Sequence, residues 1–130
     1  AEMQRYRSRQ QVRFAPLAQS PLLVAHDAYG YLLAEFGLQN VSAVVLDPHH
    51  GHASARRVNE LAQRVKREQI GCMIGEPGFA EGVGKRLFPE GHGNLVVIDP
   101  MLSGISPARD AYLIALIHLA DTLYGCMVTR

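Results

Sequence analysis

The sequence has only two cysteines, Cys72 and Cys126, and they lie far apart in the chain. Because no Cys-x-x-Cys pair is present, a zinc site built on cysteines is not expected. From the residues alone, two buried free thiols and a disulfide are equally compatible with this pair. A disulfide would indicate folding in an oxidising compartment.

An excess of either charge is also lacking, since 13 Lys and Arg residues balance 12 Asp and Glu residues. No basic surface for a nucleic acid or an acidic membrane is therefore expected. The longest apolar run, within residues 111–120, is interrupted by His118. A membrane span needs about 20 apolar residues, so we predict no transmembrane segment. Residues 1–13 are polar and rich in Arg, which is not typical of a signal peptide.

Several common catalytic motifs are missing. The Gly84-Lys85 pair has Phe79 and Arg86 where a phosphate-binding loop needs Gly and Ser or Thr,. No dinucleotide-binding Gly-x-Gly-x-x-Gly follows the first predicted strand, and no serine nucleophile elbow is found. A phosphorylated receiver domain is disfavoured as well, because the first strand ends on His26 and Lys85 does not follow a strand.

The 130 residues, 48% of them hydrophobic, are enough for one domain with a core,. Predicted strands at residues 21–26, 42–47, 72–76 and 94–99 alternate with predicted helices. The strand at 41–46 is rich in β-branched residues and is predicted to be buried, and the following helix to end at Gly71. The order βαβαβαβα, after an initial helix, predicts an α/β fold with a four-stranded parallel sheet flanked by helices. We expect residues 1–14 to be the end of a long helix and residues 15–130 to form a single α/β lobe.

Each predicted strand ends on a residue that can bind a metal: His26, Asp47, Glu76 and Asp99. Parallel strands present their carboxyl ends at one edge, where α/β proteins bind ligands. All three acids are followed by proline, which ends the strand and keeps the preceding residue extended. The pattern indicates a metal site at this edge, with a structural role for each of His26, Glu76 and Asp99 as the alternative. Asp27 is interpreted as the cap of the next helix.

Three further histidines, His49, His50 and His52, lie in the sequence Asp-Pro-His-His-Gly-His that follows the second strand. They are either an auxiliary zinc patch or an exposed polar loop. His92 is expected to face solvent. His118 is interpreted as a packing residue beside the buried face of the last helix, which is predicted to consist of Leu113, Leu116, Ile117, Ala120 and Tyr124.

The order of these motifs resembles the C-terminal lobe of periplasmic zinc-binding receptors of ABC transporters. The similar features are His-Asp-Ala-Tyr-Gly-Tyr at residues 26–31, Phe-Gly-Leu at 36–38, and Cys72 followed by Glu-Pro-Gly-Phe at 76–79. Asp99-Pro100 and a helix ending in Tyr124 and Cys126 complete the pattern. It covers the chain from about Pro21 to Cys126.

This resemblance implies a role for several residues. His26 would be a zinc ligand, Asp99 a further ligand as in manganese-binding members, and Cys72 and Cys126 a disulfide. Residues 1–14 would end the helix that joins two lobes, with the other histidine ligands on an N-terminal lobe that this chain lacks. The implied metal is zinc in preference to manganese, the implied partner an ABC permease, and the implied location the periplasm.

Two departures from the family pattern are visible: the histidine loop at residues 47–52 replaces Asn-Pro-Glu, and Gly78 stands where Gln is common. Two other functions stay open from the residues. One is a metal-dependent hydrolase that uses Asp47, Glu76, Asp99 and His26 around an activated water. The other is an interaction module on the same fold. We prefer a binding protein over an enzyme.

Overall fold

The computed structural model describes residues 2–25, 29–44, 55–75, 81–89, 92–98 and 111–128. Its elements, in chain order, are α1 (Glu2–Phe14), a 3-10 turn η1 (Ala15–Leu17), β1 (Leu22–Val24), α2 (Gly30–Glu35), β2 (Val41–Ala43), α3 (Ala55–Glu68), β3 (Cys72–Gly75), α4 (Glu81–Leu87), β4 (Asn94–Val97) and α5 (Ala111–Val128).

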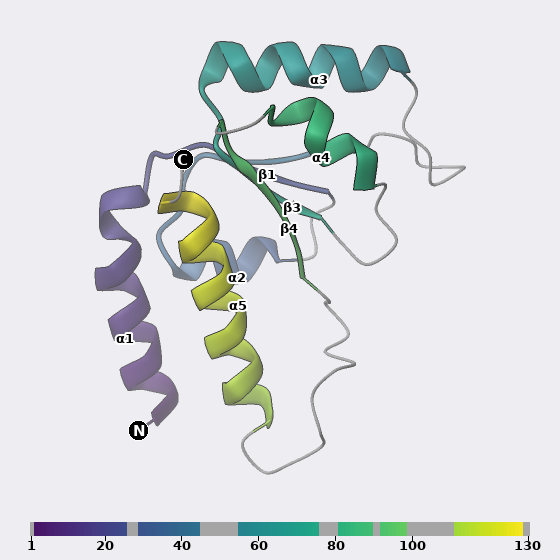
Figure 1. Ribbon diagram of the computed structural model, residues 1–130. Helices are drawn as coiled ribbons and strands as arrows, with labels where there is room; N and C mark the ends of the chain where they lie inside the picture. The colour runs from purple at the N-terminus through teal and green to yellow at the C-terminus, as the bar shows by residue number, and fades with distance from the viewer. Residues whose placement is uncertain are drawn as a thin grey trace.

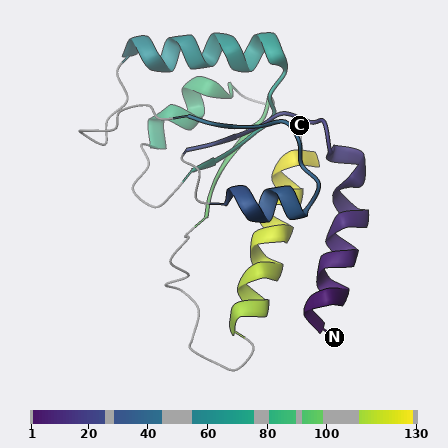
Figure 2. The same ribbon diagram turned by 180° about the vertical axis from the view of Figure 1, so that it is seen from behind.

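The four strands form one parallel sheet in the order β2-β1-β3-β4. Helices α3 and α4 cover one face, and α1, α2 and α5 cover the other (Figure 1). The same three layers are seen from behind in Figure 2. The predicted α/β architecture and strand order along the chain are therefore confirmed, as is the α-helix near the beginning of the chain.

The central strands β1 and β3 are buried on both faces, as expected for a parallel sheet between helical layers. Leu22, Val24, Cys72 and Ile74 point into the core beneath α1, α2 and α5. Their neighbours Leu23 and Met73 point to the opposite core beneath α3 and α4. Alternate residues of a strand face opposite sides, so each strand contributes to both cores.

Strand β2 differs from its prediction as a buried strand. It lies at the edge of the sheet, where Val41 and Ser42 are half-buried and Ala43 is exposed. Arg64 of α3 covers part of this edge by donating a hydrogen bond from Nη2 to the hydroxyl of Ser42, at 2.9 Å. Helix α3 has an apolar stripe, which includes Val58, Leu61 and Val65 and is buried.

Helix α2 ends at a left-handed Gly37 with φ of 85°. The amide of Gly37 donates to the carbonyl of Ala34, and the amide of Leu38 donates to that of Leu33, which is the Schellman pattern,. The start of α2 was predicted wrongly, because the helix begins at Gly30 with Tyr29, not Asp27, before it.

The end of α3 was also predicted wrongly. The helix stops at Glu68, and Gln69 rather than Gly71 adopts the left-handed conformation, with φ of 55°. The amide of Ile70 then donates to the carbonyl of Val65 at 2.9 Å. A glutamine thus adopts a backbone conformation that usually favours glycine.

The buried face of α5 agrees in part with the prediction, since Leu116 and Ala120 are buried and Leu113 and Tyr124 pack against the core. Its buried residues are Ala115, Leu116, Leu119, Ala120, Leu123, Cys126 and Met127. His118 is exposed and Ile117 is 39% exposed, so neither is a packing residue of the core.

Helix α5 is also long and strongly apolar. With 18 residues and a mean hydropathy of 1.5, it is the one helix among the described residues that is long and apolar enough to cross a membrane. Core helices meet the same criterion, and a third of this helix is buried. Ala120 and Leu123 are completely buried, which identifies the inner side of α5 as part of the core.

Helix α1 packs beside α5, and the two helices run in the same direction (Figure 1). The hydroxyl of Tyr6 donates a hydrogen bond to the carbonyl of Leu116 at 2.8 Å. The guanidinium of Arg13 pairs with Asp121 at 2.6 Å and lies 4.2 Å from the ring centre of Tyr124. The first helix is thus docked onto the lobe by specific contacts.

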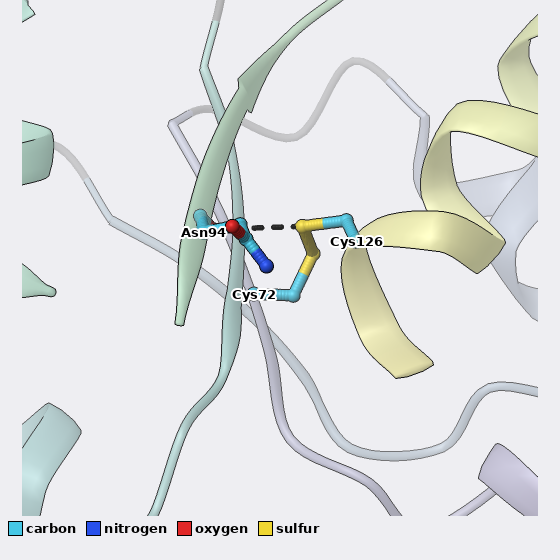
Figure 3. The surroundings of a disulfide bond; sticks show 3 residues. All are labelled: Cys72, Asn94 and Cys126. Carbon is cyan, nitrogen blue, oxygen red and sulfur yellow. Dashed lines mark hydrogen bonds between the residues drawn. A yellow bond between two sulfur atoms is a disulfide. The ribbon is translucent and has the colours of Figure 1, made fainter. Parts of the chain in front are cut away.

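A disulfide joins Cys72 at the start of β3 to Cys126 in the last turn of α5, with the two Cα atoms 5.5 Å apart (Figure 3). The disulfide that the resemblance implied is therefore confirmed. The sulfur of Cys126 also lies 3.5 Å from the carbonyl oxygen of Asn94. Because a bridged sulfur has no hydrogen to donate, this is a packing contact with β4.

Candidate metal centre

The carboxyl ends of the four strands lie together at one edge of the sheet. Pairing continues one residue beyond β1, β2 and β4: the amide of Ala25 donates to Ile74, that of Val44 to Val24, and that of Ile98 to Gly75, at 2.8, 2.8 and 3.0 Å. Hydrogen bonds between neighbouring backbones hold these positions in a fixed register. The edge therefore provides a rigid frame for whatever follows each strand.

Three of the predicted donors come directly after this frame. His26 follows Ala25, Glu76 follows Gly75 and Asp99 follows Ile98 in the sequence. These three, together with Asp27, Asp47, His49, His50 and His52, lie outside the described residues. Their assignment as ligands stays a prediction, whereas the backbone that leads to three of them is defined.

The two central strands mark the point where the direction of the chain reverses. From β1 the chain moves outward to β2, and it then crosses back to β3 on the other side of β1. Helix α2, after β1, packs in the core below the sheet, and α4, after β3, packs in the core above it (Figure 1). Connections that leave in opposite directions open a crevice at the carboxyl ends, which is where such sheets bind ligands.

A tyrosine spans this edge beside the crevice. The hydroxyl of Tyr29, at the start of α2, donates a long hydrogen bond of 3.4 Å to the carbonyl of Ile98. The contact connects the segment after β1 with the end of β4, across β3. It ties together the two stretches of chain that carry His26 and Asp99.

A pair of tyrosines joins the first turns of α2 and α5. The side chains of Tyr31 and Tyr112 share a hydrogen bond although both rings are more than half exposed. The pKa of Tyr112 is raised, first by partial desolvation and then by the neighbouring Tyr31. Tyr29 and Tyr31 both stand in the His-Asp-Ala-Tyr-Gly-Tyr motif, and we assigned no role to either tyrosine from the sequence. Their position just after His26 was the signal that they position this segment.

The described part of the chain contains no group of three or more His, Cys, Asp or Glu side chains suited to a metal. His118 is exposed on α5, and His92 is exposed, as predicted, at the start of β4. Neither contributes to the carboxyl edge, since His92 precedes its strand and His118 is in the middle of a helix. Within the described residues the frame at that edge is therefore the site to compare with known proteins.

The family described as "Zinc-uptake complex component A periplasmic" matches residues 1–126. Among curated proteins, the high-affinity zinc uptake system protein ZnuA of Brucella abortus (strain 2308) is 25% identical over 112 residues, and that of Yersinia pestis is 26% identical over 112 residues. Both alignments cover 86% of this chain but only 33% and 35% of the relatives. The chain thus spans about a third of the length of these relatives.

Solved structures share the fold. A crystal structure of ZnuA has a TM-score of 0.69 at 19% identity, covering 98% of this chain and 44% of the other. Zn(II)-bound AdcA from Streptococcus pneumoniae has a TM-score of 0.69 at 19% identity, covering 97% of this chain and 28% of the other. With its parallel sheet and a family match over nearly the whole sequence, the chain belongs to the family of the periplasmic zinc-uptake complex component A.

Proposed function

We propose that this chain is the C-terminal, zinc-binding lobe of a periplasmic receptor that delivers zinc to an ABC permease. The proposal rests above all on one observation. The central strand β1 leads directly to His26 at the point where the chain direction reverses, in a chain that belongs to a zinc-uptake family.

In this proposal His26 is the ligand that the lobe supplies. A neutral imidazole nitrogen is among the best zinc ligands, and zinc in proteins is bound by three or four protein donors. Asp99 follows the end of β4 and would add an oxygen donor with a negative charge. His49, His50 and His52 would form an auxiliary patch that captures zinc near the site. Imidazole-rich ligation favours zinc over manganese.

One histidine cannot hold zinc tightly, so the remaining ligands would come from a second, N-terminal lobe. Helix α1 would then be the end of the helix that joins the two lobes. The contacts of Tyr6 and Arg13 with α5 support this role, because they hold α1 firmly on the lobe. A helix docked in this way would transmit any movement between the lobes as a rigid body.

The function is binding rather than catalysis. The named relatives are zinc uptake proteins, and a carrier must release its metal unchanged to the next protein. A hydrolase built on the same donors would instead turn over an added ester or phosphate when metal is present.

Titration of the 130-residue chain with zinc in a calorimeter tests the proposal. His26→Ala should weaken zinc binding by about tenfold or more, which corresponds to about 1.4 kcal/mol. His118→Ala is the matched control, since it removes an exposed imidazole from α5 and should leave the affinity unchanged. The triple change of His49, His50 and His52 to Ala should reduce the number of weakly bound zinc ions.

The same samples separate the alternatives. Equal zinc affinity of the His26→Ala and His118→Ala variants would contradict the assignment of His26. Hydrolysis of a phosphate or ester substrate that depends on added zinc would contradict the receptor function.

A further inference from the structure

A cavity lies at the edge of the sheet opposite to the candidate metal centre. It has a volume of about 640 Å³ and is lined by residues from the ends of α3 and α4 and from the segments that precede β3 and β4. The lining includes Ala62, Val65, Lys66, Ile70, Arg86, Leu87 and His92. Cavities of a few hundred Å³ are typical of sites for small organic molecules.

The floor of this groove is apolar. Val65, Ile70 and Leu87 belong to the core beneath α3 and α4, and Ala62 of α3 is half-buried beside them. An apolar floor binds the hydrocarbon part of a ligand by removing it from water. The groove therefore suits a molecule with an apolar body.

The rim of the groove carries positive charge. Lys66 on α3, Arg86 on α4 and His92 before β4 are exposed around the floor, and no carboxylate is found among the described lining residues. Basic residues in the last turns of α3 and α4 also complement the helix dipoles,. His92 is not in a helix and adds an imidazole to the opposite wall of the groove.

The backbone at this rim is unusual. Gln69 holds a left-handed conformation that side chains rarely adopt, and it stands between the basic residue Lys66 and the floor residue Ile70. Backbone strain of this kind is found preferentially at functional sites. Arg86 is oriented by a hydrogen bond from its Nη2 to the side-chain oxygen of Asn59, at 2.9 Å, so one rim cation is already held in place.

From the apolar floor and the basic rim we infer that this groove binds an amphiphilic organic anion, with an apolar body on the floor and one carboxylate, sulfonate or phosphate at Lys66 and Arg86. The inference does not depend on the zinc function, because the groove lies at the amino ends of the strands. Loss of binding there should leave the zinc affinity unchanged.

Fluorescence of the anionic probe 8-anilinonaphthalene-1-sulfonate tests the inference. The double change Lys66→Gln and Arg86→Gln should weaken its binding by about tenfold, while the neutral analogue N-phenyl-1-naphthylamine should bind as before. The matched control, Arg5→Gln with Arg9→Gln, makes the same change in net charge on exposed positions of α1. Equal loss in both double variants would overturn the assigned site.

A second variant tests the floor without altering charge. Ala62→Trp fills the groove and should abolish binding of both probes, whereas Ile117→Ser removes an exposed apolar side chain elsewhere and should not. Unchanged probe binding by Ala62→Trp would overturn the inference. Circular dichroism of each variant verifies that the fold is retained.

Competition identifies the chemistry of the ligand. Dodecanoate should displace the sulfonate probe, and acetate at the same concentration should not, because it has no apolar body. Displacement by acetate as strong as by dodecanoate would reduce the groove to a simple anion site and contradict the inference. Glu90, which follows the lining residue Pro89 in the sequence, lies outside the described residues. Glu90→Gln should bind the probe at least as tightly, and weaker binding would contradict an anion site.

Discussion

At the scale of single residues, Gln69 is the clearest departure from what local chemistry favours. A left-handed conformation costs an L-residue roughly 1–2 kcal/mol, and glycine avoids this cost but loses more entropy on folding. Gln69→Gly should therefore raise the free energy of unfolding by about 0.5–1 kcal/mol. Urea denaturation measures the change.

Gln63 of α3 provides the control for this prediction, because it is exposed in the helix interior. Gln63→Gly should lower the stability by about 0.5–1 kcal/mol, since glycine is a poor helix former. If both glycine variants were destabilised alike, the end of α3 would not be strained at Gln69.

Tyr6 is a second residue whose chemistry depends on its place in the fold. Burial, and then the negative charge of Asp121, raises the pKa of its hydroxyl to about 12 from the ordinary value of 10. The neutral hydroxyl is thus favoured in the folded protein, so the contribution to stability is complete below pH 10 and declines as the pH rises from 10 towards 12.

The loss of stability should be measurable at pH 11. One pH unit above the ordinary pKa of 10 lowers the free energy of unfolding by about 1.4 kcal/mol. We expect Tyr6→Phe to lose less stability between pH 9 and pH 11 than the unmodified chain, as measured by urea denaturation at each pH. Tyr124→Phe is the control, since it removes a phenol hydroxyl from a half-buried ring. A pH dependence that is the same in Tyr6→Phe as in the original chain would refute the role of Tyr6.

At the scale of elements, most helices and strands could be predicted from the sequence because each has its own pattern. The strands are short runs of β-branched and apolar residues, and Gly37 marks the end of α2. The order of the strands within the sheet could not be predicted in this way. Whether β2 lies at the centre or the edge depends on which strand pairs with β1, and that is a property of the assembled sheet.

The buried face of α5 shows which signal was neglected. Counting back from Cys126 in steps of three and four residues gives Leu123, Leu119 and Ala115, all of which are buried,. A bridged cysteine must face the sheet, so the implied disulfide already fixed the inner side of α5. The predicted buried face was chosen from the apolar residues alone. Because α5 is apolar on nearly every side, the predicted face was turned toward Ile117.

The disulfide should contribute strongly to stability because it closes a long loop between β3 and α5. For a separation of 54 residues, the loss of chain entropy in the unfolded state corresponds to about 4 kcal/mol. Changing both Cys72 and Cys126 to Ala should lower the free energy of unfolding by about 2–4 kcal/mol, measured by urea denaturation.

Reduction gives an independent measurement of the same bond. Both cysteines are almost completely buried, at 1% and 3% exposure, so a thiol-specific reagent should detect two thiols only after denaturation with reductant. Two thiols that react in denaturant without reductant would show that the bridge is absent in the protein as prepared.

At the scale of the whole molecule, the sheet edge and its point of reversal are what the fold contributes to the candidate site. The sequence allowed the edge to be predicted, since every strand was expected to end at a donor. It did not allow the tyrosine contacts around that edge to be predicted, because Tyr29 meets Ile98 only after β4 has paired with β3. Contacts between distant segments depend on packing rather than on local pattern.

A ligand that binds only this assembled edge must stabilise the whole molecule. At a free zinc concentration 100 times the dissociation constant, mass action adds about 2.7 kcal/mol to the free energy of unfolding. We therefore expect the melting temperature to rise by several degrees with zinc, progressively with its concentration, and to return to its original value with EDTA. His118→Ala should show the same rise, and His26→Ala should need about tenfold more zinc to reach it. A rise that is equal in all three proteins would place the zinc at another site of the folded chain, and His26 would then make no contribution to its binding.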